Sequence, residues 1–141
     1  MVENPQETIG NLIDKKEISL ISAVDENGFP STMGMLAPVK REGLKTFYWH
    51  TNSPSRKIKY YRNNPKACIY FLDEGTFCGA MLKGTMEVLE DEKTKEELWK
   101  DDFSIYYEGG MNGGDFTILK FTADTGRYYD GETGTYDFVV E

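Results

Sequence analysis

Short stretches rich in apolar and aromatic residues recur along the chain, separated by turn residues, and this pattern predicts strands. Residues 18–24 (ISLISAV) and 30–39 (PSTMGMLAPV) form the first pair. Between them, Asn27 and Gly28 supply the positive φ that a tight hairpin needs. Residues 115–123 (DFTILKFTA) alternate apolar and polar positions, as in a half-exposed strand. The other predicted strands are residues 44–52, 66–73, 76–90, 126–131 and 135–140.

Three segments have helical patterns instead. Residues 4–17 carry apolar residues on one face, and Asn4, followed three residues later by Glu7, predicts a capping box. Residues 91–107 begin with acidic residues, which oppose the helix dipole and favour a helix start there. A shorter helix is expected at residues 53–64.

Glycines inside the predicted strands mark places where a regular ladder is expected to be disturbed. Gly34 predicts a bulge or the close approach of another group to the backbone. Gly79 and Gly84 predict bends or bulges in the long strand of residues 76–90.

The order of these elements predicts the fold class. Six or seven strands joined by short turns do not alternate with the helices, which argues against a doubly wound parallel sheet. The pattern fits a mainly β fold, namely a small antiparallel β-barrel with flanking helices. The chain has 141 residues, no internal repeat and no linker, so residues 1–141 are expected to form a single domain.

Charge and composition then exclude several classes of partner. The formal net charge of -8 and the pI near 4.7 argue against nucleic-acid binding, which needs a broad basic face. No apolar run reaches the roughly 18 to 20 residues of a membrane helix, and the polar N-terminus does not resemble a signal peptide. Cys68 and Cys78 lie in apolar segments and are interpreted as buried free thiols. The expected location is cytoplasmic.

The side chains offer little catalytic chemistry of their own. His50 is the only histidine, so a Ser-His-Asp triad or a histidine-rich metal site is not expected. No metal is predicted. Phosphate-binding glycine motifs are absent and no pair of carboxylates stands out, which leaves the catalytic residues unassigned. His50 alone remains a candidate acid or base, and a cofactor is expected to supply any reactive group.

One stretch reverses the sign of the chain's charge. Between Glu42 and Asp73 there is no acidic residue, and residues 50–65 (HTNSPSRKIKYYRNNP) are basic. Ser53 is the expected helix cap and Pro54 the first helical residue, which puts Ser55, Arg56 and Lys57 in the first turn. Free backbone N–H groups, a guanidinium and an ammonium at a helix start suit a phosphate. The alternative is a basic helix face that only contacts water.

At this stretch the sequence resembles the FMN-binding split-barrel proteins related to pyridoxamine 5'-phosphate oxidase, and it is most similar to the branch called general stress protein 26. The resemblance rests on Thr51-Asn52, Ser55-Arg56-Lys57 and Asn63-Asn64-Pro65. The surrounding order of segments also matches: GFPSTMGML before them, then GAMLKGTMEVL, ELWKDDFSIYYEGG and GRYYDG. The likeness covers nearly the whole chain.

The resemblance implies a six-stranded antiparallel split barrel that forms a two-fold homodimer with FMN in a cleft between the subunits. Arg56 and Lys57 are then expected to hold the FMN phosphate with Ser55 beside them, and His50 and Thr51 to lie against the flavin and ribityl chain. Tyr129 is expected to reach the flavin of the other subunit. The edge of the flavin ring would follow the strand that contains Met33, Gly34, Met35 and Leu36.

Three departures from the oxidase argue against vitamin B6 oxidation. Met33 stands where the oxidase has a basic residue and Gly79 where it has glutamine, and residues 132–141 contain no arginine or histidine. The chain is therefore predicted to be a flavin-dependent oxidoreductase of an unidentified small molecule. The alternatives are a non-catalytic protein that binds flavin, haem or another flat cofactor, with a stress-related role, and a structural dimer with an empty pocket.

Overall fold

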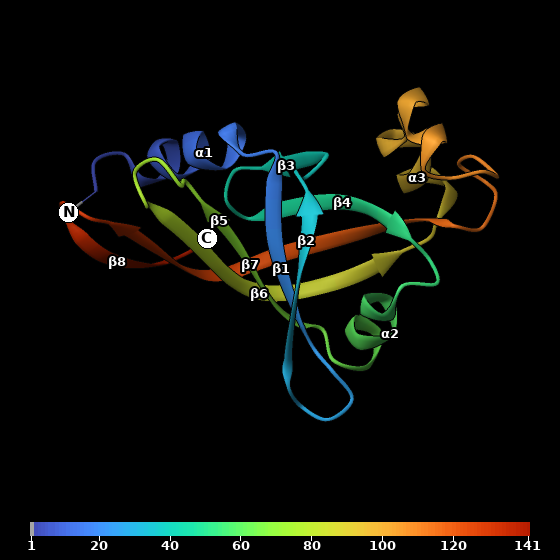
Figure 1. Ribbon diagram of the computed structural model, residues 1–141, viewed down its shortest axis with the longest axis horizontal. Helices are drawn as coiled ribbons and strands as arrows, with labels where there is room; N and C mark the ends of the chain where they lie inside the picture. Colours follow the sequence, from blue (N-terminus) through green and yellow to red (C-terminus); the bar gives the residue numbers. More distant parts are fainter. Residues whose placement is uncertain (1) are drawn as a thin grey trace.

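The computed structural model describes residues 2–141, which form one curved antiparallel sheet with helices packed around it (Figure 1). The strands are β1 (Ile18–Val24), β2 (Pro30–Leu36), β3 (Lys40–Glu42), β4 (Thr46–Asn52), β5 (Lys66–Leu72), β6 (Gly79–Leu89), β7 (Phe116–Asp130) and β8 (Gly134–Val139). The helices are α1 (Pro5–Lys15), α2 (Arg56–Asn63), α3 (Glu92–Leu98) and the 3-10 helix η1 (Asp101–Ile105).

Strand β7 organises the sheet. The strand order is β2-β1-β5-β6-β7-β4-β3, and β6 pairs with β7 along almost its whole length. The opposite edge of β7 is shared, because residues 116–122 pair with β4 and residues 125–130 pair with β8. The sheet therefore divides at the middle of β7 and does not close into a complete barrel.

The predicted fold class, a mainly β antiparallel split barrel with flanking helices, is confirmed, but the number of strands is eight rather than six. Residues 40–43 lie between the predicted strands 30–39 and 44–52, yet Lys40–Glu42 pairs with β4 as the short strand β3. The predicted strands 115–123 and 126–131 are one continuous strand, β7, and β8 forms the closing hairpin with it.

The helix starts and ends differ from the sequence prediction in three places. Asn4 has φ 43° and its side chain makes no capping hydrogen bond, so the predicted capping box is wrong. The N-cap position of helix α2 is Ser55 rather than Ser53, and the Ser55 side chain makes no capping hydrogen bond. The single helix expected at residues 91–107 is broken, because Trp99 takes an extended conformation and packs edge-on against Phe116 with ring centroids 4.9 Å apart.

One of the three glycines expected to disturb the strands does so. The β6–β7 register shifts between Lys83 and Gly84, so the ladder is disturbed at Gly84 as expected, but the residue without a pairing partner is Asp124 of β7 and not a residue of β6. Gly34 pairs with Leu20 in continuous register, and Gly79 pairs regularly with Tyr129, so no bulge forms at either position. The backbone of Gly34 is open, with no atom close to the place where a Cβ would stand.

The core has two parts. The larger cluster fills the inside of the sheet under α1 and α2, with Trp49, Phe47, Phe71 and Phe121 nearly or fully buried. A smaller cluster lies at the far ends of β4 and β7, where the segment between β6 and β7 covers them (Figure 1). We call residues 92–114 the cap segment. It is anchored by Leu98, Phe103 and Tyr107, which pack on Phe116 and Ile118.

Candidate functional site

A cavity of about 390 Å³ lies between the ends of β2 and β4, the start of α2 and the cap segment. Six of the residues expected to contact a cofactor line it: Gly34, Met35, Leu36, His50, Thr51 and Lys57. Tyr106 and Tyr107 of the cap segment, which the sequence pattern did not single out, form another wall of the same cavity. The fold therefore brings three distant segments of sequence to one place.

The other four expected residues lie outside this cavity. Met33 is partly buried against the main core, and Ser55 and Arg56 stand at the start of α2. Tyr129 is 45% exposed on the half of β7 that pairs with β8.

A buried hydrogen-bond chain fixes the two strands that form the cavity walls. The indole N–H of Trp49 donates to the Ser19 hydroxyl at 3.0 Å, and Ser19 donates to the Leu36 carbonyl at 2.8 Å. Trp49 is 1% exposed and Ser19 is also 1% exposed, so no water competes for these bonds. The end of β2 is thereby held at a set distance from β4.

His50 packs into the aromatic side of the cap segment. Its ring stacks on Phe103 with centroids 4.1 Å apart, and its Nδ1 lies 2.7 Å from the Tyr107 hydroxyl. Burial lowers the pKa of His50 below its ordinary value, while the Asp102 carboxylate acts in the opposite direction and Lys100 adds to the lowering. His50 is therefore neutral near pH 7.

Acidification should destabilise the folded chain through His50. Because the folded pKa lies below the ordinary 6.5, the unfolded chain binds more protons between those two values. The free energy of unfolding should fall as the pH drops from about 6.5 and level off below the folded pKa. Urea unfolding of the wild type and of His50→Gln between about pH 5 and 8 measures this, since the variant lacks the titrating ring. Parallel pH profiles for the two proteins would contradict the expectation.

The start of α2 carries two polar groups that lack partners. The Ser55 hydroxyl oxygen is buried and makes no hydrogen bond. The Lys57 ammonium is half-buried, its pKa is lowered by burial, and within residues 2–141 no carboxylate forms an ion pair with it. Buried polar groups and cations are costly when unpaired, so the start of α2, beside the cavity that Lys57 lines, is suited to an anion.

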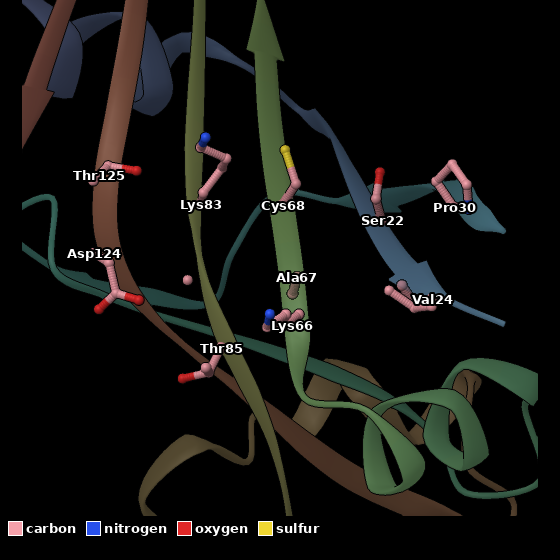
Figure 2. A pocket seen from close by; sticks show the side chains of 12 residues that line it. Ser22, Val24, Pro30, Lys66, Ala67, Cys68, Lys83, Thr85, Asp124 and Thr125 are labelled. Carbon is pink, nitrogen blue, oxygen red and sulfur yellow. The ribbon is translucent and has the colours of Figure 1, made fainter. Parts of the chain in front are cut away.

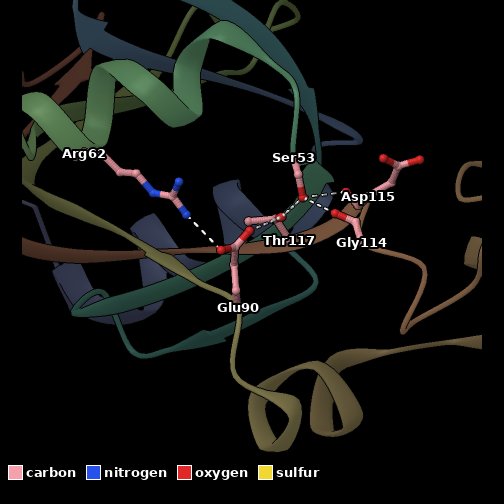
Figure 3. Close-up of polar contacts among 6 residues, drawn as sticks. All are labelled: Ser53, Arg62, Glu90, Gly114, Asp115 and Thr117. Carbon is pink, nitrogen blue, oxygen red and sulfur yellow. Dashed lines mark hydrogen bonds and ion pairs between the residues drawn. The ribbon is translucent and has the colours of Figure 1, made fainter.

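A polar network holds the turn before α2 in place (Figure 3). The Ser53 hydroxyl donates to the Gly114 carbonyl at 2.8 Å and contacts the hydroxyl of Thr117. Thr117, which is fully buried, lies 3.4 Å from the Glu90 carboxylate, and Glu90 accepts a bond from Arg62 at 2.9 Å. This network thus ties together the ends of β4 and β6, the start of β7 and helix α2, around the turn that precedes α2.

A second cavity, of about 400 Å³, lies over strands β1, β5, β6 and β7 (Figure 2). Ser22, Cys68, Lys83 and Thr125 stand in one row across these four strands. Burial raises the pKa of the Cys68 thiol, so the thiol is protonated near neutral pH and is a weak nucleophile. Both cysteines are free thiols, as expected, but they are half-buried rather than fully buried.

Two properties of residues 2–141 bear on the expected partners. No helix in this part of the chain is both long and apolar enough to cross a membrane. The same residues contain no cluster of three or more histidine, cysteine or carboxylate side chains suited to a metal ion.

The divided antiparallel sheet and the cavity at the start of α2 define a split-barrel protein with a small-ligand pocket. The family model described as pyridoxamine 5'-phosphate oxidase like matches residues 4–141. The chain belongs to this family, as its sequence motifs indicated.

Solved structures identify the branch within the family. The chain is 36% identical to a protein from Clostridium acetobutylicum that is related to general stress protein 26 of Bacillus subtilis, in the pyridoxinephosphate oxidase family. The match covers 99% of this chain and 97% of that one, with a TM-score of 0.89. General stress protein 26 from Bacillus anthracis shares the fold at 20% identity, with 98% and 100% covered and a TM-score of 0.79. The resemblance to this branch is confirmed.

The same fold also occurs in a heme binding protein from Mycobacterium smegmatis. That chain is 13% identical, the match covers 99% of this chain and 59% of that one, and the TM-score is 0.77. At this identity the likeness concerns the fold alone. The sequence matches no curated protein.

Proposed function

We propose that this chain binds FMN and acts as a flavin-dependent oxidoreductase, or reductase, of a small molecule. The observation that carries the proposal is the half-buried Lys57 ammonium without an ion-pair partner, at the wall of the cavity. Two residues before it in the sequence, the Ser55 hydroxyl is buried and has no hydrogen-bond partner within residues 2–141. A phosphate dianion would satisfy both groups, together with the free N–H groups at the start of α2.

The residues present fit the rest of the cofactor. The phosphate would contact Ser55, Arg56 and Lys57, because a guanidinium and an ammonium can each donate to its oxygens. The open backbone of β2 at Gly34 lets a flat ring approach closely, with the N–H and C=O groups of Met35 along its polar edge. When bound, FMN supplies hydride or electron transfer, and the protein binds and orients it.

The positions at which the oxidase is expected to bind its substrate carry no positive charge in this chain, which argues against pyridoxamine phosphate as the substrate. A second phosphate would need its own cations, yet Met33 and Gly79 are uncharged and residues 132–141 contain no arginine, lysine or histidine. The substrate is therefore expected to lack a phosphate group in that position.

We also propose that two copies of the chain form a dimer that completes the site. Large apolar side chains are exposed on β1 and β2, where Ile18 is 57% exposed and Leu36, at the cavity, is 49% exposed. Tyr129 stands too far along β7 to line the cavity of its own chain, and its exposed ring is available to a partner's flavin. Covering these groups supplies a physical reason for association.

Native mass spectrometry of the protein as purified tests the cofactor and the dimer in one measurement. The expected species contains two chains of 16.1 kDa and two molecules of FMN. Release of the small molecule under denaturing conditions and its accurate mass then identify it. A colourless monomer that ignores added FMN would refute both proposals. A dimer that carries haem, or no ligand, would refute the flavin assignment alone.

A non-catalytic binding protein is the second candidate function. It is favoured by the scarcity of proton-transfer groups, because His50 is the only histidine of the chain. Steady-state oxidation of NADH or NADPH by the flavin-loaded protein, with a quinone or a nitroaromatic compound as acceptor, distinguishes the two. Turnover supports the oxidoreductase, whereas a bound flavin that is never reduced supports the binding protein.

A further inference from the structure

The hydroxyl of Tyr107 has one hydrogen-bond partner in the structure, which is Nδ1 of His50 at 2.7 Å. Tyr107 is 4% exposed, and burial raises its pKa to about 12, so the phenol keeps its proton at any ordinary pH. A buried O–H group that donates to nothing is costly. Donation from Tyr107 to Nδ1 satisfies this O–H group, whereas a bond in the opposite direction would leave it without an acceptor among residues 2–141.

This direction of donation determines where the histidine carries its proton. A neutral imidazole has one N–H, so a ring whose Nδ1 accepts a bond must be protonated at Nε2. Stacking on Phe103 at 4.1 Å and the edge of Tyr107 at 5.6 Å hold the ring in one orientation. His50 lines the cavity, and within residues 2–141 its Nε2 has no hydrogen-bond partner.

We propose that Tyr107 is a positioning residue that fixes His50 as the Nε2–H tautomer, and that this N–H selects ligands with a hydrogen-bond acceptor on a flat ring. The proposal rests on the flavin-binding function proposed above. The matching chemistry is a ring carbonyl or an imine-type ring nitrogen, which accepts a bond but carries no hydrogen. The isoalloxazine ring of FMN presents both kinds of acceptor along one edge.

The same tautomer disfavours iron as the partner of His50. A histidine that ligates haem iron through Nε2 must have that nitrogen free of hydrogen, which moves the proton to Nδ1. The Tyr107 oxygen would then accept a bond from Nδ1–H, and the buried phenol proton would be left without an acceptor. The cap segment therefore biases the pocket toward flavin and away from haem, although the fold is shared with a heme binding protein.

The first test uses the fact that His50 is the only histidine. In tag-free protein labelled with nitrogen-15, the two ring nitrogens give the only imidazole signals. Long-range proton–nitrogen spectra above the pKa of His50 should show the proton on Nε2. Tyr107→Phe should shift the signals toward a mixture of tautomers, because the donor to Nδ1 is gone. A proton found on Nδ1 in the wild type would overturn the proposal.

The second test measures FMN affinity by quenching of flavin fluorescence. His50→Asn keeps a polar atom near the position of Nδ1 but loses the Nε2 donor, and it should weaken binding roughly three- to tenfold, as expected for one hydrogen bond. His50→Gln places its amide N–H near the position of Nε2 and should recover part of that loss. Equal affinities for the wild type and His50→Asn would overturn the selective role of His50.

The outcomes separate this proposal from the proposed function. If the wild type binds FMN and His50→Asn binds it equally tightly, FMN binding stands and the role of His50 is rejected. If the wild type does not bind FMN, the flavin assignment and the selection of its ring by His50 are both rejected, whatever the tautomer. Tight hemin binding with an absorption spectrum of histidine-ligated iron would also overturn the proposal.

Discussion

Replacing Arg56 and Lys57 together by alanine should weaken FMN binding by well over tenfold. Each charged hydrogen bond to a phosphate is worth about 1.5 to 3 kcal/mol, and the double variant removes both cations from the first turn of α2. Lys57 should contribute more than Arg56, because its ammonium is half-buried at the cavity whereas Arg56 is exposed. The dialysed wild type and the dialysed double variant are each titrated with FMN, and flavin fluorescence gives the dissociation constant of each protein.

A matched control removes two other positive charges. Lys59, later on α2, is 70% exposed, and Lys93 lies in α3, so Lys59→Ala with Lys93→Ala changes the net charge equally. This control should bind FMN with little change at physiological salt, since exposed charges are screened. Equal weakening in both double variants would mean that overall charge, and not the start of α2, attracts the phosphate. An unchanged FMN affinity in the variant that combines Arg56→Ala with Lys57→Ala would refute the phosphate site.

Gly84→Ala should lower the free energy of unfolding by roughly 3 kcal/mol, at the upper end of what overpacking costs. A Cβ at this position would stand 1.9 Å from the carbonyl oxygen of Thr122 and 2.9 Å from the Cα of Ala123. Both atoms belong to the backbone of β7 and cannot rotate away. Relief therefore requires β6 and β7 to separate at the bulge, where β7 also changes its partner from β4 to β8.

Gly34→Ala is the control for this prediction. It is also a glycine inside a strand, but no atom lies within 4 Å of the point that an added Cβ would occupy, and its φ is ordinary. Its stability should stay equal to that of the wild type or rise slightly, by up to about 1 kcal/mol, because alanine restricts the unfolded chain. Urea unfolding followed by far-ultraviolet circular dichroism measures both variants. A loss of equal size in both would contradict the close contact at Gly84.

The strands were predictable where the apolar pattern is local. Residues 18–24 form β1 with the expected bounds, because the pattern and the Asn27-Gly28 turn agree. The continuity of β7 was not predictable, since Asp124, Thr125 and Gly126 have the composition of a turn. Thr125 and Gly126 remain in a strand because β6 and β8 pair with them on both sides, and the carbonyl of Asp124 accepts a bond from the Val140 N–H at 2.9 Å. These partners lie far away in the sequence.

The site was predictable in part for a similar reason. Lys57, His50 and the β2 backbone belong to segments whose motifs resemble a family, and they do line one cavity. Tyr106 and Tyr107 were expected to end a regular helix, and nothing in the local sequence says that this helix breaks at Trp99. The break is caused by packing against Phe116, which the sequence alone does not place next to it.

The shared edge of β7 has a consequence for synthesis of the chain. Strand β4 carries His50 and Thr51, and on one edge it pairs with the short β3 while on the other it needs residues 116–122. Until the ribosome has released those residues, β4 of the nascent polypeptide presents bare N–H and C=O groups, which favour pairing with foreign strands. Newly made chains are therefore expected to depend on chaperones until residues 116–122 have left the ribosome.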